Sequence, residues 1–461
     1  MKTANKQIDN LNRKEPFRMP IVWFSAFVCL MLFQTSYMRL GTITAVAAIF
    51  LSIVAVFMSK SIGGKTMVPA RSLLIALFMI FTALYAVLKG TTPSYLIRYC
   101  AQIVLFVVLS LLELNERENE ILKWVFSVSS AVYAVLSVVS TFLYGRSGYF
   151  HESVRLFGTY IDPNYLTIPF VVACVIMFDR LLNGPNRLPA LILLVVNFTA
   201  IVVAASRGSI LCLVAAITFV LIFFITNKKQ SFGKVLSMIF LISVLIAVSI
   251  ILINKQFSGQ VDRILDMDFN DGNGRIEIWS KGLAAFRRSP ILGNGFGYMQ
   301  MQYGTLAHNT FIQLLAESGL VGTGVFIVFM IMMFRKAIGY SRLFFVIMLS
   351  ASIQFMFLDV IDNRTLWIVF IWIAMLPEKK KKKNAVPVPV NVRSVTAPPQ
   401  NGDAVSMPPE KIGKPEQTEQ TELKKQPETP EQTLPADAGA AREKETPDPA
   451  EADIQAKETA I

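Results

Sequence analysis

The residues whose chemistry is easiest to interpret lie between Ser289 and Gly322. Pro290 and the three glycines from Gly293 to Gly297 predict a loop, because neither residue type continues a regular helix. His308 and Asn309 then precede an apolar run, and asparagine is a favoured N-cap. We therefore expect His308 at the mouth of an apolar helix, where a neutral imidazole can accept a proton near neutral pH.

Three arginines stand in polar segments between apolar blocks: Arg155, Arg207 and Arg275. Arg207 lies in Ala-Ser-Arg-Gly, where a tight turn leaves backbone N–H groups beside the guanidinium. Arg275 opens an amphipathic segment directly after a turn rich in glycine and asparagine. A forked guanidinium at a helix N-terminus suits the oxygens of a phosphate. The open alternative is interfacial anchoring for Arg207 and a solvated surface charge for Arg275 and Arg155.

The composition excludes an ordinary soluble protein. Of 461 residues, 53% are hydrophobic and only 16% are charged. The four cysteines all lie inside apolar blocks, so they are interpreted as small buried side chains instead of disulfides or metal ligands. The net charge of +12 comes largely from basic residues beside apolar blocks, which indicates membrane orientation and no nucleic-acid partner.

The apolar blocks predict an all-α polytopic membrane protein, because each approaches the roughly 20 residues that cross a bilayer. We predict about twelve transmembrane helices, with a large extracytoplasmic loop (255–309) between helices 9 and 10. The predicted spans are 20–37, 41–59, 71–88, 95–113, 121–144, 164–182, 188–205, 208–226, 234–254, 310–334, 343–360 and 364–377.

The distribution of lysine and arginine predicts the orientation. With a cytoplasmic N-terminus, the cytoplasmic segments carry many more Lys and Arg than the short outer loops, so both termini are expected inside a bacterial plasma (inner) membrane. In the large outer loop, 275–288 predicts an amphipathic helix with Ile276, Trp279, Leu283 and Phe286 on one stripe. It would lie on the outer membrane face or pack on the bundle. Residues 1–377 form the predicted transmembrane domain and 378–461 a disordered cytoplasmic tail.

Taken together, the motifs resemble the O-antigen ligase and O-antigen polymerase superfamily of bacterial membrane glycosyltransferases. The resemblance covers about residues 140–335, and the tail has no counterpart in it. The matching motifs are Arg155-Leu-Phe-Gly158 with Asp162-Pro-Asn164, Ser206-Arg-Gly208, Gly274-Arg275 with Trp279, Pro290-Ile-Leu-Gly-x-Gly-x-Gly297, and His308-Asn309 with Glu317-x-Gly-x-x-Gly322.

This resemblance implies transfer of a glycan from undecaprenyl diphosphate to an acceptor hydroxyl on the outer face, in cell-surface polysaccharide biosynthesis. Arg207 and Arg275 would hold the diphosphate and His308 would activate the acceptor, with no metal or other cofactor. Direct displacement would invert the anomeric centre. Arg155, Asn309 and Glu317 are predicted to bind substrate, and the alternative for Glu317 is that it pairs with an arginine or anchors the loop.

Several alternatives remain open at this point. The acceptor can be a lipid A core, another lipid-linked glycan chain, a cell-wall polymer or a protein hydroxyl. A lipid-linked glycan flippase or transporter is the alternative function, although such a protein is expected to show repeated halves and charged or broken helices near the midplane. A membrane scaffold acting through its tail would instead lose function when residues 385–461 are deleted.

Overall fold

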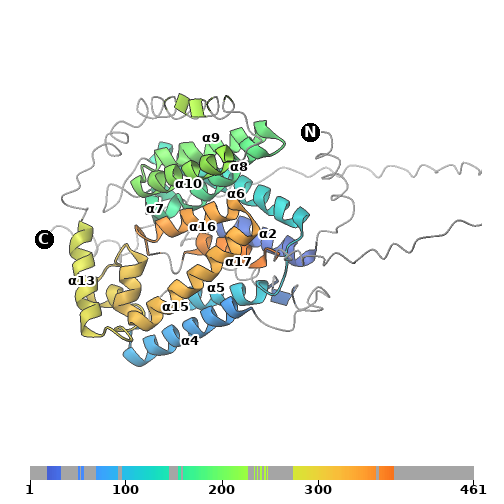
Figure 1. The fold of residues 1–461 in the computed structure, drawn as a ribbon. Coiled ribbons are helices and arrows are strands. Elements are labelled where there is room, and N and C mark those ends of the chain that lie inside the picture. The colour runs from blue at the N-terminus through green and yellow to red at the C-terminus, as the bar shows by residue number, and fades with distance from the viewer. Residues whose placement is uncertain are drawn as a thin grey trace, which may run out of the picture. The chain divides into compact units, whose positions relative to one another are not determined.

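The protein is described by a computed structural model, and residues 18–32, 69–91, 96–144, 154–156, 159–226, 274–359 and 363–377 are described, with scattered residues in 50–56 and 233–247. The helices are α2 (Met19–Leu32), α4 (Ala70–Lys89), α5 (Leu96–Leu109), α6 (Glu116–Tyr144), α7 (Pro163–Leu166), α8 (Ile168–Asn183), α9 (Arg187–Val203), α10 (Arg207–Ile225), α13 (Arg275–Arg288), α14 (Tyr298–Tyr303), α15 (Thr310–Tyr340), α16 (Arg342–Gln354) and α17 (Arg364–Met375) (Figure 1). A short antiparallel hairpin pairs β1 (Val154–Leu156) with β2 (Thr159–Ile161).

The described part of the chain is a bundle of apolar helices. Within the residues that the structure describes, five helical segments are long and apolar enough to cross a membrane: α4, α6, α10, α15 and the segment Pro163–Asn183, which includes α7 and α8. Five further apolar helices, namely α2, α5, α9, α16 and α17, are shorter. The predicted helical, multi-span character is confirmed at this level.

Most of the predicted spans coincide with one of these helices. The spans 41–59 and 234–254 fall largely outside the described residues, as do residues 255–273 of the large loop and the tail 378–461. The number of twelve spans, the extracytoplasmic loop and the cytoplasmic termini therefore stay predictions.

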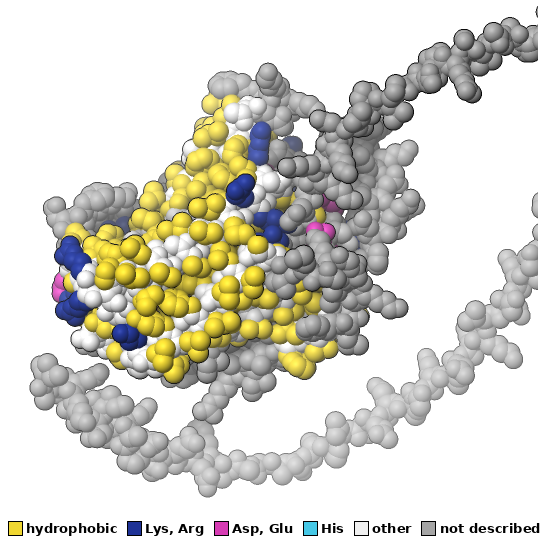
Figure 2. Space-filling view, turned by 60° about the horizontal axis from the view of Figure 1, so that its bottom comes forward, with side chains coloured by type: hydrophobic (Ala, Val, Ile, Leu, Met, Phe, Trp, Pro, Cys, Tyr) yellow, Lys and Arg dark blue, Asp and Glu magenta, His cyan; other side chains and the backbone are white. Residues whose placement is uncertain are grey.

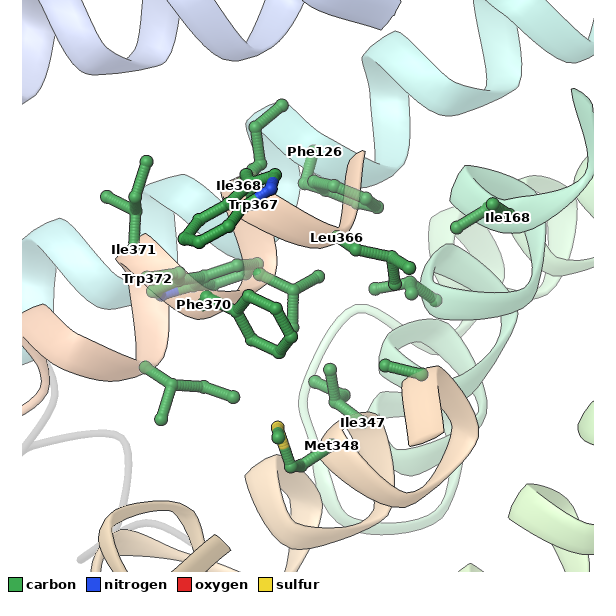
Figure 3. Packing of buried hydrophobic residues seen from close by; sticks show 14 of the residues in the cluster. Phe126, Ile168, Ile347, Met348, Leu366, Trp367, Ile368, Phe370, Ile371 and Trp372 are labelled. Atoms are coloured by element: carbon green, nitrogen blue, oxygen red, sulfur yellow. The ribbon is translucent and has the colours of Figure 1, made fainter. Parts of the chain in front are cut away.

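The core of the bundle is built around α17. All its residues from Leu366 to Met375 are buried, as expected for a helix surrounded by others. Trp367 and Phe370 pack edge to face with ring centroids 5.5 Å apart, and Trp372 packs against Phe344 of α16 at 5.3 Å. Figure 3 shows α17 side chains among residues of α6, α8 and α16. This rigid aromatic core supports the segments that carry the candidate site.

α15 is broken at Gly319, whose φ of 61° and ψ of −162° are not helical. The break leaves backbone N–H groups without helical partners. Leu320 N donates to Pro290 O at 2.9 Å, and Val321 N donates to Ile291 O at 3.1 Å. An apolar environment offers no water to these groups, so the loop after α13 supplies the acceptors.

The carbonyls before the break are satisfied by the same loop. Asn294 N donates to Ala316 O at 3.1 Å, and Gly295 N donates to Glu317 O at 3.0 Å. The Asn294 side-chain amide adds a 2.8 Å bond to the same Ala316 carbonyl. The segment from Pro290 to Gly295 therefore acts as a backbone splint for the break in α15. We call residues 290–295 the splint loop.

Glycine is required in the splint loop because the two backbones touch. A Cβ on Gly293 would overlap the backbone of Glu317, and one on Gly319 would overlap the backbone of Ile291. Gly293 also has a φ of 76°, which side-chain-bearing residues rarely adopt. The glycine-rich motif thus has a packing function here.

α13 packs against α15 through small residues. Gly282 and Ala285 are buried, and a Cβ on Gly282 would lie 2.6 Å from Ile312 Cγ2. The predicted apolar stripe is not the face that packs on α15, because two of its residues, Ile276 and Leu283, are exposed. Of the two placements predicted for this helix, α13 therefore adopts packing on the bundle. The periodicity of large apolar residues did not identify its buried face.

We expect Gly293→Ala and Gly319→Ala to lower the temperature of thermal unfolding, because each adds a backbone clash at a residue with positive φ. Strain of each kind costs about 1–3 kcal/mol. Gly324→Ala is the matched control on α15, since nothing lies within 4 Å of its Cβ. Its unfolding temperature should be unchanged or higher, because alanine favours a helix. Fluorescence-monitored melting in detergent measures this, and similar melting of all three variants would contradict the splint.

Candidate active site

His308 lies in the turn between α14 and α15, just beyond the splint loop. Its φ is 49°, a left-handed conformation that costs a histidine roughly 1–3 kcal/mol. The Asp359 carboxylate Oδ2 accepts a 2.7 Å hydrogen bond from the His308 backbone N–H. Asn309 then caps α15 by accepting from Phe311 N at 3.0 Å. The backbone of His308 is thus held from both sides.

Asp359 also faces the imidazole. Its Oδ2 lies 3.9 Å from His308 Nδ1, which is beyond hydrogen-bond distance but within the range of an ion pair when the imidazole is protonated. The Asp359 side chain is 8% exposed, whereas the His308 side chain is 32% exposed. With Nδ1 turned towards the carboxylate, Nε2 is the nitrogen on the other side of the ring and the one available to act as a base.

The protonation of His308 depends on burial and on two nearby charges. Partial burial lowers the pKa of the imidazole below its usual value. The Asp162 carboxylate raises this pKa, and the Arg275 guanidinium lowers it. The net direction is downward, so the neutral imidazole persists to lower pH than in an ordinary histidine. Two residues far away in sequence, on α13 and before α7, therefore act on His308 electrostatically.

The turn Asp162-Pro-Asn164 joins β2 to α7 and contacts the site on two sides. Asp162 Oδ1 accepts from Asn164 N at 2.7 Å and caps α7. Tyr165 donates its hydroxyl to the Asp359 carbonyl at 2.9 Å. The turn is thereby connected both to His308, through the charge of Asp162, and to the segment that carries Asp359.

Arg207 is the first residue of α10, and its neighbours connect it to the same turn. The Ser206 hydroxyl donates to Asn164 Oδ1 at 2.7 Å and also caps α10. A Cβ on Gly208 would lie 3.6 Å from the side chain of Phe357, two residues before Asp359. The structure thus places the start of α10 beside two of the segments that surround His308.

Arg275 is the first residue of α13. Its helix begins after Gly274, which has a φ of 73°, and it is held near the site by a tryptophan one turn further on. Trp279 Nε1 donates to Ala307 O at 2.9 Å, directly before His308. This bond, together with the effect of Arg275 on the imidazole pKa, brings the predicted arginine and histidine into one neighbourhood.

The three residues predicted to bind substrate have different positions. Arg155 lies in β1 opposite Tyr160, and its strand partner leads into Asp162. Asn309 is buried, caps α15 and donates to Met356 O at 3.3 Å. Glu317 is buried and accepts from Met299 N at 3.1 Å and from the Gln313 amide at 2.5 Å, so it anchors α14 as its alternative role predicted. Substrate binding by all three stays a prediction.

Sequence reasoning missed Asp359 as a site residue. It was placed inside the apolar span 343–360, and its partner His308 is far away in sequence. A carboxylate near the end of an otherwise apolar block was the available signal, because an ionisable residue there needs a partner. Asp162 was noted only as part of a turn, and nothing in its sequence context indicated an effect on His308.

A second polar cluster lies where α6, α8 and α16 meet. Glu120 pairs with Arg180 at 2.6 Å and with Lys123 at 2.5 Å, and the cluster borders cavities that also involve Asp179 and Arg342. The residues around these cavities do not include His308 or Asp359. The charges of Glu120, Lys123 and Arg180 are mutually paired, which is typical of structural ion pairs.

In the described residues, the His308 imidazole and the buried Asp359 carboxylate thus lie near the starts of two helices that begin with arginine. Residues 191–327 match the family model described as O-antigen ligase. This segment includes Arg207, Arg275 and His308, and the match confirms the resemblance to the O-antigen ligase and polymerase superfamily. The family indicates a glycosyltransferase-like membrane enzyme of cell-surface polysaccharide synthesis. No curated protein matches the chain in a sequence comparison.

We expect Asp359→Asn to reduce glycan transfer about 10²-fold, because the amide can still accept the His308 N–H bond but carries no charge beside Nδ1. Asp359→Ala loses both interactions, so it should reduce transfer at least as much and also lower the unfolding temperature. Glu277→Gln is the control, since Glu277 is an exposed carboxylate of α13 paired with Lys281. Initial rates of transfer measure the effect, and unchanged transfer by Asp359→Asn would remove Asp359 from the site.

Proposed function

We propose that this protein transfers a glycan from an undecaprenyl-diphosphate-linked donor to an acceptor hydroxyl at the outer face of the plasma membrane. The observation that carries the proposal is the grouping of His308 with Asp359, Asp162 and Arg275 at the end of the bundle where α10 also begins with Arg207. The family match supports the same reaction class.

In this reaction His308 Nε2 accepts the proton of the acceptor hydroxyl as its oxygen attacks the anomeric carbon of the donor sugar. The bond from that carbon to the diphosphate oxygen breaks, and undecaprenyl diphosphate leaves with the electron pair. A general base of this kind contributes about 10²–10⁴-fold. Asp359 stabilises the imidazolium that forms. Attack opposite the leaving group inverts the anomeric configuration.

Negative charge grows on the departing diphosphate, and the protein's own cations stabilise it. Arg207 and Arg275 each begin a helix, so each residue stands at the positive end of a helix dipole. Pre-placed donors of this kind stabilise developing charge without reorganising at the moment of reaction. The reaction therefore proceeds without a metal ion in our proposal.

The orientation completes the proposal. His308 faces the outside of the cell, both termini lie in the cytoplasm, and residues 378–461 form a cytoplasmic tail outside the transferase domain 1–377. The acceptor supplies only a hydroxyl group to the chemistry, so ligase and polymerase reactions share this mechanism. In this proposal Arg155, which pairs with Tyr160 in the hairpin that leads into Asp162, contacts the donor glycan or its diphosphate.

The central test is transfer by purified, reconstituted protein supplied with a lipid-linked oligosaccharide and an acceptor, with a chelator present. We expect His308→Ala, Arg207→Ala and Arg275→Ala each to reduce release of undecaprenyl diphosphate by at least about 10²-fold. Arg187→Ala is the matched control for Arg207, because Arg187 is also the first residue of an apolar helix but is exposed at α9.

The outcomes separate the proposal from its alternative. Near-normal release by both His308→Ala and Arg207→Ala, in proteins that still insert and melt normally, would refute the mechanism. Movement of the lipid-linked glycan across the bilayer without release of undecaprenyl diphosphate would identify a flippase instead.

The pH dependence of transfer provides an independent check on His308. Transfer requires the neutral imidazole, so it should rise with pH through a pKa below the ordinary histidine value and then level off. Asp162→Asn removes a charge that raises this pKa and should move the rise to lower pH, while asparagine still caps α7. Arg275→Gln should move it to higher pH. Profiles of kcat/KM that coincide for all three proteins would contradict the assignment.

A further inference from the structure

Two helices present exposed apolar side chains near the splint loop. On α4, Leu84, Val87 and Leu88 are 61%, 63% and 82% exposed. On α15, Leu320 and Val321, directly after the break, are also exposed. Both helices are candidate membrane spans, so these outward side chains continue their lipid-facing surfaces. Hydrophobic side chains cover much of the face drawn in Figure 2.

The turn after α13 adds two more apolar residues to this surface. Ile291 is 64% exposed and Leu292 is 41% exposed, although both follow a polar helix end. Ile291 O accepts from Val321 N, and the next residue, Gly293, accepts at its carbonyl from the Tyr85 hydroxyl at 3.0 Å. The turn is therefore fixed by hydrogen bonds to α15 and to α4, and its side chains join an apolar surface shared by three elements.

Positive charges border this apolar surface. Arg287 and Arg288 end α13, Lys89 ends α4, and all three are exposed. Gly295 of the splint loop lies against Lys89, since a Cβ there would be 2.9 Å from Lys89 Cβ. Exposed cations at the edge of an apolar band are typical of the level of lipid headgroups.

The lengths of the helices agree with this level. α4 has 20 residues, or roughly 30 Å at about 1.5 Å per residue, and it ends beside the splint loop. The part of α15 after the break, residues 320–340, is also roughly 30 Å long. That length matches the hydrocarbon thickness of a bilayer. Both helices thus span the hydrocarbon from the opposite side and reach its boundary at the splint loop.

We infer that the turn 289–292 is a lipid-binding anchor, with Ile291 and Leu292 among the acyl chains of the leaflet on the His308 side and Arg287, Arg288 and Lys89 on lipid phosphates. The break at Gly319 marks the hydrocarbon boundary. The part of α15 before the break, with α13 packed on it, then stands above the acyl chains and carries His308 at a fixed height. This inference does not depend on the reaction that the site performs.

The insertion is tested with an environment-sensitive fluorophore on Ile291→Cys or Leu292→Cys, in full-length protein whose four native cysteines are replaced by alanine. The protein is reconstituted alone into phosphatidylcholine–phosphatidylglycerol vesicles. The control is Glu277→Cys, at the far end of α13 from the turn and highly exposed. At 291 and 292, we expect quenching by lipids spin-labelled near the headgroup and at least threefold weaker quenching by iodide than at 277.

Quenching by iodide at 291 that equals the quenching at 277 would overturn the inference. A surface that binds a protein partner predicts that same result, because the vesicles contain no partner. A background without cysteines that misfolds is replaced by Ile291→Trp and Glu277→Trp in the native chain, with the same quenchers and the unsubstituted protein as the baseline.

The headgroup contacts are tested separately. Phosphatidylglycerol should raise the unfolding temperature of the native protein in detergent, and Arg287→Ser with Arg288→Ser should lose at least half of that rise. Arg187→Ser, an exposed arginine at the start of α9, is the control and should keep the full rise. Free phosphate at equal concentration distinguishes a lipid contact from simple anion binding. An undiminished rise in the double variant, or an equal rise with free phosphate, would overturn the proposed lipid contacts.

Discussion

The backbone of α15 at Gly319 is the constraint on which the candidate site depends. A helix break exposes amide and carbonyl groups, and an apolar environment makes each unsatisfied group costly. Here the splint loop bonds to both sides of the break, and glycines allow the two backbones to touch. A side chain at Gly293 or Gly319 would push the backbone of the splint loop away from the backbone of α15. The break in α15 is thus stabilised by hydrogen bonds from the splint loop.

This constraint fixes the position of the catalytic candidates. The splint loop follows α13 directly, so satisfying the break also places α13 along the first part of α15. Trp279 then reaches the carbonyl of Ala307, and the start of α13 brings the charge of Arg275 to His308. Asp359 holds the strained backbone of His308 from the opposite side. Local turns alone would not bring these residues together.

Much of this arrangement could be predicted from the sequence where a residue has a strong local signal. The helix start at Asn309, the loop at Pro290, and the start of α13 at Arg275 follow from capping and turn preferences. The buried face of α13 could not be predicted, because Gly282 and Ala285 carry little hydropathy signal. Asp359 was missed because its role depends on a partner many residues away. The periodicity of apolar residues predicts the local helix, but it does not predict which distant segments of the chain come into contact.

The proposed reaction sets two electrostatic requirements, one for the diphosphate and one for the general base. In the proposed reaction a diphosphate needs positive potential, and Arg207 and Arg275 each stand at the positive end of a helix. A general base must stay unprotonated, and burial, aided by the nearby Arg275 guanidinium, lowers the pKa of His308 and so favours the neutral imidazole. The Asp162 carboxylate opposes this effect by raising the same pKa, and the Asp359 carboxylate lies 3.9 Å from His308 Nδ1. In the proposed mechanism the arginines therefore stabilise the leaving diphosphate while the pKa of His308 stays suitable for a general base. This requires that the carboxylates face His308 and that the guanidinium groups face the donor.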